Sequence, residues 1–401
     1  MAVNSIFLHI RMSARISPQS INSDLFLYKT RFISFVLLLA YTFLHTRLTV
    51  IYIQVTLEQM LDFCTRMPFA QRLLVPAMAK LLSSFLPFSP GSLFFLLEFL
   101  FTAAFFFSLQ ALLQRQLSRR ASLVCSWLFL LLLPLLSVVN YRIMFGGPAT
   151  FYYPSDSASL FFISMGFLLC LQKRWTLLLF WIFLSTFNRE SSILLVLLIP
   201  ALHWSDRKQI AKPMIAAVLL YILARLIILH LTKNSPGPLT EWYDQFFGHT
   251  YFETNFNWLF RQLAIFLVNF CFMGLPLLWF AFIDYIPPQL RPIRFIALFY
   301  FLGLQLIGNF SEVRIFHEIV ILLYLPVCTA VNRWIQNEPF YEADYSHAGL
   351  FFLNRYAVSL ILLATTLAHP LLEPLVVKIA NLSGSKNHRA TNEDWYDKYY
   401  R

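Results

Sequence analysis

The sequence predicts an all-α, polytopic membrane protein, and three observations support this fold class. Of the 401 residues, 58% are hydrophobic and 13% are charged, whereas soluble domains have about half apolar and about a quarter charged residues. The apolar residues gather in runs, many of which approach the roughly 20 residues that a membrane-crossing helix needs. Lys and Arg, which produce the net charge of +11, fall in short loops between the runs, where they orient a membrane protein. The positive charge therefore indicates topology and not nucleic-acid binding.

About eleven apolar runs are expected to form a transmembrane helical bundle over residues 31–380. Residues 1–30 are polar and basic and lack the apolar stretch of a cleaved signal peptide, so they are expected to form a cytoplasmic N-terminal segment. Residues 381–401 are expected to be a polar C-terminal tail. The runs are 32–53, 91–113, 121–139, 155–172, 175–187, 191–202, 213–231, 258–283, 295–308, 315–331 and 351–372.

Extracytoplasmic loops are expected near 55–90, 140–156 and 232–257. The acidic residues gather in and near these loops, whereas the inner loops are basic, as the positive-inside rule requires. The first of these loops is amphipathic and interrupted by prolines, which indicates an interfacial or re-entrant segment. Any chemistry that depends on carboxylates is therefore expected on the extracytoplasmic face.

A short paired-helix hairpin is expected around 175–204. The charged triplet Asn188-Arg189-Glu190 separates two apolar runs, each shorter than a normal span, and basic clusters close both outer ends. Charge inside a membrane segment costs about 3 kcal/mol or more and usually faces protein or water. We expect the triplet to form the hairpin tip, with both hairpin ends on the cytoplasmic side.

The candidate functional residues lie in four outer segments. Glu58 and Asp62 follow the first span, where a carboxylate could act as a general base, and Arg72 could hold a lipid phosphate. Each of these also fits a solvated interfacial helix or a structural Arg–Asp pair. Asp156 fits either a binding role or an N-cap, for which Ser155 is equally suited.

The remaining candidates come from the hairpin tip and from a later outer segment. Arg189 and Glu190 fit a substrate site or a buried ion pair that fixes the hairpin. Glu312, Arg314 and Glu318 fit a phosphate clamp or a helix start, in which Arg314 and Glu318 share a face four residues apart. His45, Glu98 and Arg225 are weaker candidates, since each fits an interhelical polar contact.

Several classes of protein are not indicated. The sequence has no Walker A, HExxH or GxSxG pattern, and the five cysteines follow no metal-binding or disulfide spacing. No metal ligands are therefore assigned.

Four motifs together resemble a family of poorly characterised bacterial membrane proteins. They are Pro68-Phe-Ala-Gln-Arg-Leu-Leu-Val-Pro76, Tyr153-Pro-Ser-Asp156, Phe187-Asn-Arg-Glu-Ser-Ser-Ile193 and Glu312-Val-Arg-Ile-Phe-His-Glu318. That family is in turn similar to the GT-C superfamily of membrane glycosyltransferases. The characteristic paired acidic motif of that superfamily is absent here, because the first outer loop has Glu58 and Asp62 four residues apart.

The resemblance implies a GT-C-like fold in a bacterial inner membrane and an inverting transfer of sugar from a polyprenyl-phosphate donor. Asp62 or Glu58 would be the base, and Arg72, Arg189 or Arg314 would bind the phosphate. A divalent metal could take part but is not required, since arginine alone can neutralise the phosphate. The alternatives are a lipid-linked-glycan transporter or flippase and a non-catalytic protein of envelope assembly.

Overall fold

The computed structural model describes most of the chain and shows a helical protein with one very short antiparallel strand pair. The N-terminal 17 residues, the expected tail 381–401 and part of the last apolar run lie outside the described part. The described residues are 18–52, 54–139, 150–240, 243–244, 249–261, 269–310, 312–339, 349, 352, 355–364 and 367.

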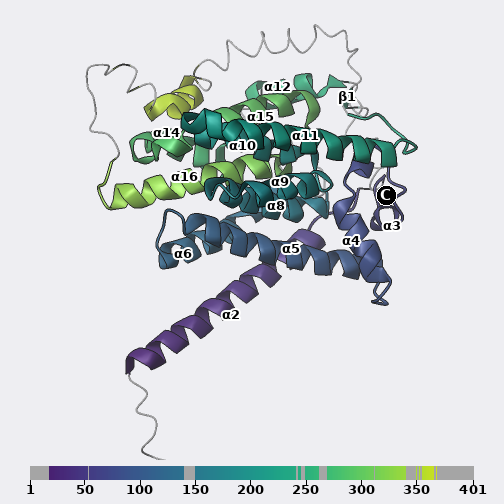
Figure 1. Ribbon diagram of the computed structural model, residues 1–401, viewed down its shortest axis with the longest axis horizontal. Coiled ribbons are helices and arrows are strands. Elements are labelled where there is room, and N and C mark those ends of the chain that lie inside the picture. Colours follow the sequence, from purple (N-terminus) through teal and green to yellow (C-terminus); the bar gives the residue numbers. More distant parts are fainter. Residues whose placement is uncertain are drawn as a thin grey trace, which may run out of the picture.

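The first half of the chain contains long helices, with short helices in the first outer loop (Figure 1). Pro68 breaks the chain between two of these short helices, as the sequence predicts, whereas Pro76 lies inside a helix, in the first turn of Leu74–Ser83. The elements are α2 (Pro18–Arg47), α3 (Leu57–Leu61), the 3-10 turn η1 (Phe69–Gln71), α4 (Leu74–Ser83), α5 (Pro90–Leu113), α6 (Arg119–Leu132), α7 (Pro134–Ser137) and α8 (Ser155–Leu171).

The second half begins with the hairpin and ends with a long helix that passes through the centre of the bundle. The elements are α9 (Trp175–Thr186), η2 (Glu190–Ser192), α10 (Ile193–His203), η3 (Trp204–Asp206), α11 (Arg207–Leu231), β1 (Tyr243–Asp244), β2 (His249–Thr250), α12 (Tyr251–Arg261), α14 (Leu275–Ala281), η4 (Ile283–Tyr285), η5 (Pro288–Leu290), α15 (Ile293–Ile307), η6 (Val313–Phe316) and α16 (His317–Ile335). A further helical segment covers Arg355–Ala364.

Within the described residues, six helical stretches are long and apolar enough to cross a membrane. This confirms a multi-pass membrane protein, while the expected number of about eleven spans stays a prediction. The stretches are Leu27–Arg47, Pro90–Leu113, Arg119–Ser137, Glu190–Leu231, Pro288–Ile307 and Val313–Ile335.

Three expected spans differ from the observed helices. The first helix ends at Arg47 and not near residue 53, because Val50 pairs with Phe151 in a parallel bridge. The run 213–231 begins earlier, at Arg207, and Pro213 lies inside the helix. The run 258–283 is not one continuous helix, because Met273 and Gly274 adopt left-handed backbone conformations just before α14.

The hairpin is observed as expected. Asp206 and Lys173 form an ion pair of 2.7 Å between its two ends, and His203 lies 2.9 Å from the carbonyl oxygen of Cys170. The helix α11 then returns along α10, because Tyr221 donates a hydrogen bond of 3.1 Å to the carbonyl oxygen of Glu190. The long apolar stretch Glu190–Leu231 is therefore two antiparallel segments joined by η3.

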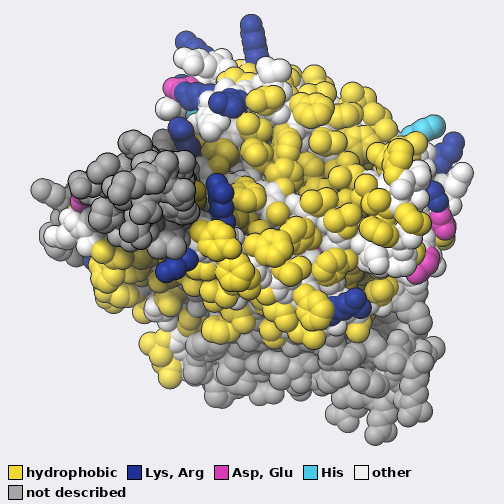
Figure 2. All heavy atoms as spheres, turned by 90° about the horizontal axis from the view of Figure 1, so that it is seen from below, with side chains coloured by type: hydrophobic (Ala, Val, Ile, Leu, Met, Phe, Trp, Pro, Cys, Tyr) yellow, Lys and Arg dark blue, Asp and Glu magenta, His cyan; other side chains and the backbone are white. Residues whose placement is uncertain are grey.

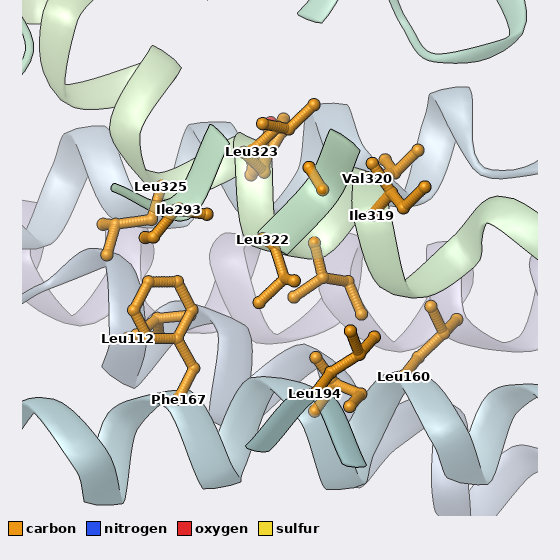
Figure 3. Close-up of a cluster of buried hydrophobic side chains, with 14 of the residues drawn as sticks. Leu112, Leu160, Phe167, Leu194, Ile293, Ile319, Val320, Leu322, Leu323 and Leu325 are labelled. Carbon is orange, nitrogen blue, oxygen red and sulfur yellow. The ribbon is translucent and has the colours of Figure 1, made fainter. Parts of the chain in front are cut away.

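The core lies around α16. Within Val313–Ile335, the stretch that contains α16, 83% of the most hydrophobic 18-residue segment is buried. Leu322 of α16 lies between side chains of α5, α8, α10 and α15 (Figure 3). Dense apolar packing of this kind holds helix ends in fixed positions, and it therefore fixes the polar residues at those ends.

The outer surface is largely apolar. Figure 2 shows a broad hydrophobic face, with Lys and Arg mainly near its margins. The helix α11 presents many exposed apolar side chains, including Ile222 and Leu226. Because water disfavours apolar patches of this extent on a soluble protein, the surface is consistent with a lipid environment.

Candidate functional site

The centre of the candidate site is Asp156, in the first turn of α8. Its Oδ1 lies 3.1 Å from Nη1 of Arg189 and its Oδ2 lies 3.2 Å from Nη1 of Arg314. Arg189 also lies 3.5 Å from Oε1 of Glu318, and Arg314 lies 2.5 Å from Oε2 of Glu312. The structure therefore brings together five of the residues that the sequence singled out.

The hairpin tip places Arg189 in this cluster. The side-chain amide nitrogen of Asn188 donates to the carbonyl oxygen of Ser155 at 3.1 Å and to the hydroxyl of Ser159 at 2.9 Å. These bonds fix the tip against the first turn of α8. The acids Asp156 and Glu318 each lie in the first turn of a helix, where the helix dipole stabilises negative charge.

Two sequence-based interpretations of this region are corrected by the structure. Neither Ser155 nor Asp156 is an N-cap, because α8 begins after Pro154 without a side-chain cap, and Asp156 instead binds the two arginines. Arg314 and Glu318 do not form the expected pair four residues apart, because Arg314 lies in a 3-10 turn before α16, whose tighter winding changes the spacing.

Glu318 is held by the hairpin as well as by Arg189. The hydroxyl of Ser191 in η2 donates a hydrogen bond of 2.7 Å to Oε1 of Glu318. Glu318 and Asp156 are fully buried, and Arg189 and Arg314 are nearly so. Because removing one partner from a buried ion pair leaves an uncompensated charge, these residues depend on one another.

An aromatic residue connects this cluster to the first outer loop. The guanidinium of Arg314 lies 4.0 Å from the ring centroid of Tyr153, and the ring of Phe69 stacks on Tyr153 at 5.0 Å. Arg72 lies 5.2 Å from the Phe69 ring and 5.5 Å from the Tyr153 ring. Burial raises the pKa of the Tyr153 hydroxyl, so this side chain stays neutral between two cations.

Arg72 differs from Arg189 and Arg314 because it has no acidic partner among the described residues. Its Nε and Nη1 atoms are buried without a hydrogen-bond partner in the described part of the chain. Burial lowers the pKa of Arg72, and the nearby Arg189 lowers it further. An anion beside Arg72 would therefore be stabilised.

A small cleft opens beside Arg72, with room for about one water molecule. Its wall combines the first outer loop with the turn before α8, and it is largely apolar, as small-molecule sites usually are. The lining residues are Met60, Phe63, Thr65, Phe69, Ala70, Arg72, Leu73, Pro76, Tyr153, Pro154 and Ser155.

The expected catalytic residues Asp62 and Glu58 lie next to this cleft and outside the buried cluster. Both are exposed, and Oδ1 of Asp62 lies 2.8 Å from Nζ of Lys80 in α4. Met60 and Phe63, close to Asp62 in sequence, line the cleft, whereas Asp62 itself does not. The expected structural partner of Asp62, an arginine, is replaced by this lysine.

Glu190 is exposed, unlike its neighbour Arg189. Its carboxylate forms no ion pair with any residue that the structure describes. The buried ion pair that fixes the hairpin tip is therefore formed by Arg189 with Asp156 and not with Glu190.

A second buried polar group lies deeper in the bundle. His45 Nδ1 lies 2.7 Å from Oε1 of Glu98, and Glu98 also accepts hydrogen bonds from Ser157 and Tyr152. The interpretation of His45 and Glu98 as interhelical polar contacts is therefore confirmed.

Asn255 in α12 has a role that its sequence context does not indicate. This side chain donates to the carbonyl oxygen of Gly308 at 2.6 Å and accepts from the backbone nitrogen of Phe310 at 2.8 Å. It thereby fixes the segment that leads to Glu312 and Arg314. The sequence around Asn255 does not indicate this role, because its partners are more than fifty residues away in sequence.

In the described part of the chain, no three His, Cys, Asp or Glu side chains are grouped in a way that could hold a metal ion. The sequence matches no model of a known protein family, and no curated protein is significantly similar to it. The function is therefore inferred from the geometry of the site.

Proposed function

We propose that this protein is a membrane glycosyltransferase that moves a sugar from a polyprenyl-phosphate donor to an acceptor hydroxyl on the extracytoplasmic side. The observation that supports it best is Arg72, a cation without an ion-pair partner among the described residues. It lines a cleft together with Met60 and Phe63, which lie close to Asp62 in the sequence. A guanidinium offers several N–H donors in a planar fork that matches phosphate oxygens.

Arg72 is a better phosphate ligand than Arg189 or Arg314. Both of the latter already bind carboxylates, and a phosphate would have to displace these buried acids. Arg72 needs no such rearrangement. We assign Arg189, Arg314, Asp156, Glu312 and Glu318 to holding the site together around it.

The proposed reaction needs one base. A carboxylate, Asp62 or the neighbouring Glu58, takes the proton of the acceptor hydroxyl. The acceptor oxygen forms a bond to the anomeric carbon from the side opposite the phosphate, and the bond from that carbon to the phosphate oxygen breaks. The lipid phosphate leaves with the bonding electrons, and the configuration at the anomeric carbon is inverted.

The test is sugar transfer by purified protein in liposomes, with a panel of radiolabelled polyprenyl-phosphate sugars. Loss of a general base lowers rates by about 10²–10⁴-fold, so we expect this loss in Asp62→Asn or Glu58→Gln. Asp206→Asn is the matched control, since Asp206 is also partly exposed and paired with a lysine. Absence of transfer from every donor by folded wild-type protein would contradict the proposal.

The buried ion cluster supports a second candidate function, a lipid-linked-glycan flippase. Charged residues inside a membrane protein often line a substrate path, and Asp156, Arg189 and Arg314 are buried among the apolar helices. A flippase forms and breaks no covalent bond in its substrate, so it does not require a general base at Asp62. Lipid translocation that is unchanged in Asp62→Asn, together with no sugar transfer by the wild type, would favour this function.

A further inference from the structure

A second arginine without an ion-pair partner in the described structure, Arg225, contacts Gln71, the residue that precedes Arg72. It belongs to α11, six residues before the end of that helix. Its Nη2 donates to Oε1 of Gln71, whereas its Nη1 is buried without a partner in the described part of the chain. A charge in an apolar helix that is only partly satisfied requires an explanation, because placing it there is costly.

Gln71 connects the two arginines. Its Nε2 donates a hydrogen bond of 3.0 Å to the carbonyl oxygen of Leu239, which leaves Oε1 to accept from Arg225. Gln71 directly precedes Arg72 at the end of η1. The amide therefore holds Arg225 beside the segment that carries Arg72.

The hairpin tip contacts both segments. The backbone nitrogen of Leu74, two residues after Arg72, donates a hydrogen bond of 3.0 Å to the carbonyl oxygen of Phe187, just before the tip. Tyr221, four residues before Arg225 and therefore on the same helix face, binds the carbonyl oxygen of Glu190. The hairpin tip, η1 and α11 thus enclose a region with two cations and one open acid.

This region borders the lipid-facing surface. Ile222, Leu223 and Leu226, which flank Arg225 on α11, are between 47% and 59% exposed. Figure 1 shows that α11 extends toward the side of the molecule where α3 and α4 lie. A ligand could reach Arg225 along the membrane without crossing the buried cluster.

We propose that Arg225 and Arg72 together bind the phosphate of a lipid that enters sideways from the membrane past α11. The proposal rests on the proposed function in one respect, since it places the lipid phosphate at Arg72. It adds a second phosphate ligand, a positioning role for Gln71 and an entry side. The ligand is a lipid-borne phosphate and not free phosphate.

The test measures equilibrium binding of farnesyl phosphate to the full-length protein in phosphatidylcholine nanodiscs, with farnesol and inorganic phosphate as the other two probes. A hydrogen bond to a charged group contributes enough for about a tenfold change in affinity. We expect Arg225→Gln and Arg72→Gln each to weaken farnesyl phosphate binding about tenfold. Arg207→Gln, at the other end of α11, should change it less than about twofold.

Glu190→Gln is expected to change the affinity for farnesyl phosphate in the opposite direction to the two arginine substitutions. If the phosphate lies between the two arginines, the nearby carboxylate repels it, so the substitution should tighten farnesyl phosphate binding about two- to fivefold. A purely structural role for Glu190 would not produce tighter binding. Arg225→Lys keeps the charge and guards against misfolding, and it should bind more tightly than Arg225→Gln.

Three results would overturn the inference: wild-type affinity in folded Arg225→Gln and Arg225→Lys, equal binding of farnesol, or displacement by inorganic phosphate at equal concentration. The proposed function fails separately. Sugar transfer that depends on Asp62 but not on Arg225 would support the proposed enzyme activity and contradict the phosphate site at Arg225. Phosphate binding that depends on Arg225, without any sugar transfer, would support the site and contradict the enzyme activity.

Discussion

Arg189 at the hairpin tip reaches Asp156 at the start of α8, with 3.1 Å between Nη1 and Oδ1. The same carboxylate binds Arg314 through its other oxygen. One acid therefore links three segments of the chain: the first turn of α8, the hairpin tip and the turn before α16.

Asp156→Asn is expected to destabilise the protein strongly. The substitution leaves two buried guanidiniums short of a negative charge, and breaking a buried pair typically costs about 3–5 kcal/mol. Thermal unfolding in detergent micelles measures the effect. Asp206→Asn, which removes one partner of an exposed pair, should change the unfolding temperature little; an equally small change in Asp156→Asn would contradict the central role of this residue.

His45 and Glu98 are expected to be energetically coupled. Their side chains are fully buried and 2.7 Å apart, and contacting residues usually show coupling energies of about 0.5–3 kcal/mol. A double-mutant cycle with His45→Phe and Glu98→Gln, followed by unfolding, measures the coupling. Strictly additive effects would show that the contact contributes nothing beyond its two parts.

Gly166→Ala is expected to loosen the contact between α8 and α10. A Cβ at this position would lie 2.5 Å from Cδ2 of Leu195, a side chain that is fully buried, and overpacking of this kind costs about 1–3 kcal/mol. Gly303→Ala in α15 is the control, because the described structure places no atom from outside the helix backbone within 4 Å of the Cβ that alanine would add. The prediction is wrong if the two variants unfold at the same temperature.

Labelling of cysteine thiols tests which side of the membrane the site faces. Cys64 lies in the first outer loop and is exposed, so a membrane-impermeant maleimide should label it in intact cells, and Cys64→Ser should remove this labelling. Ser205 is exposed in η3, at the base of the hairpin opposite its tip, and we expect this end to face the cytoplasm. Ser205→Cys in the Cys64→Ser background should react only after the cells are permeabilised, and labelling of intact cells would invert the topology.

The sequence predicts local features well. The bounds of α5 and α9 lie within one residue of the expected runs, because hydrophobic length and basic flanks act locally along the chain. The hairpin was also predictable, since its charged tip interrupts two apolar runs that are each too short to span.

The pairing of charges was not predictable. Asp156 and Arg314 are 158 residues apart in sequence, and which helix ends meet depends on how the helices pack. Arg189 pairs with Asp156 and Glu318 and not with the adjacent Glu190. Arg314 pairs with Asp156 and with the nearby Glu312, and not with Glu318. Short-range spacing ignores such competition, because a buried charge takes whichever partner the packing brings close.

Hydrophobicity along the chain is enough to identify a helical membrane protein and to locate the segments that carry its charged residues, because each segment responds to the bilayer independently. The neutralisation of individual arginines is instead a property of the folded bundle. Arg189 and Arg314 both bind Asp156 at the start of α8, far from either in sequence, and Arg314 also binds the nearby Glu312. Arg72 and Arg225 have no ion-pair partner in the described structure. The physical reason is that long-range packing, which no local pattern encodes, selects the carboxylates that each guanidinium contacts.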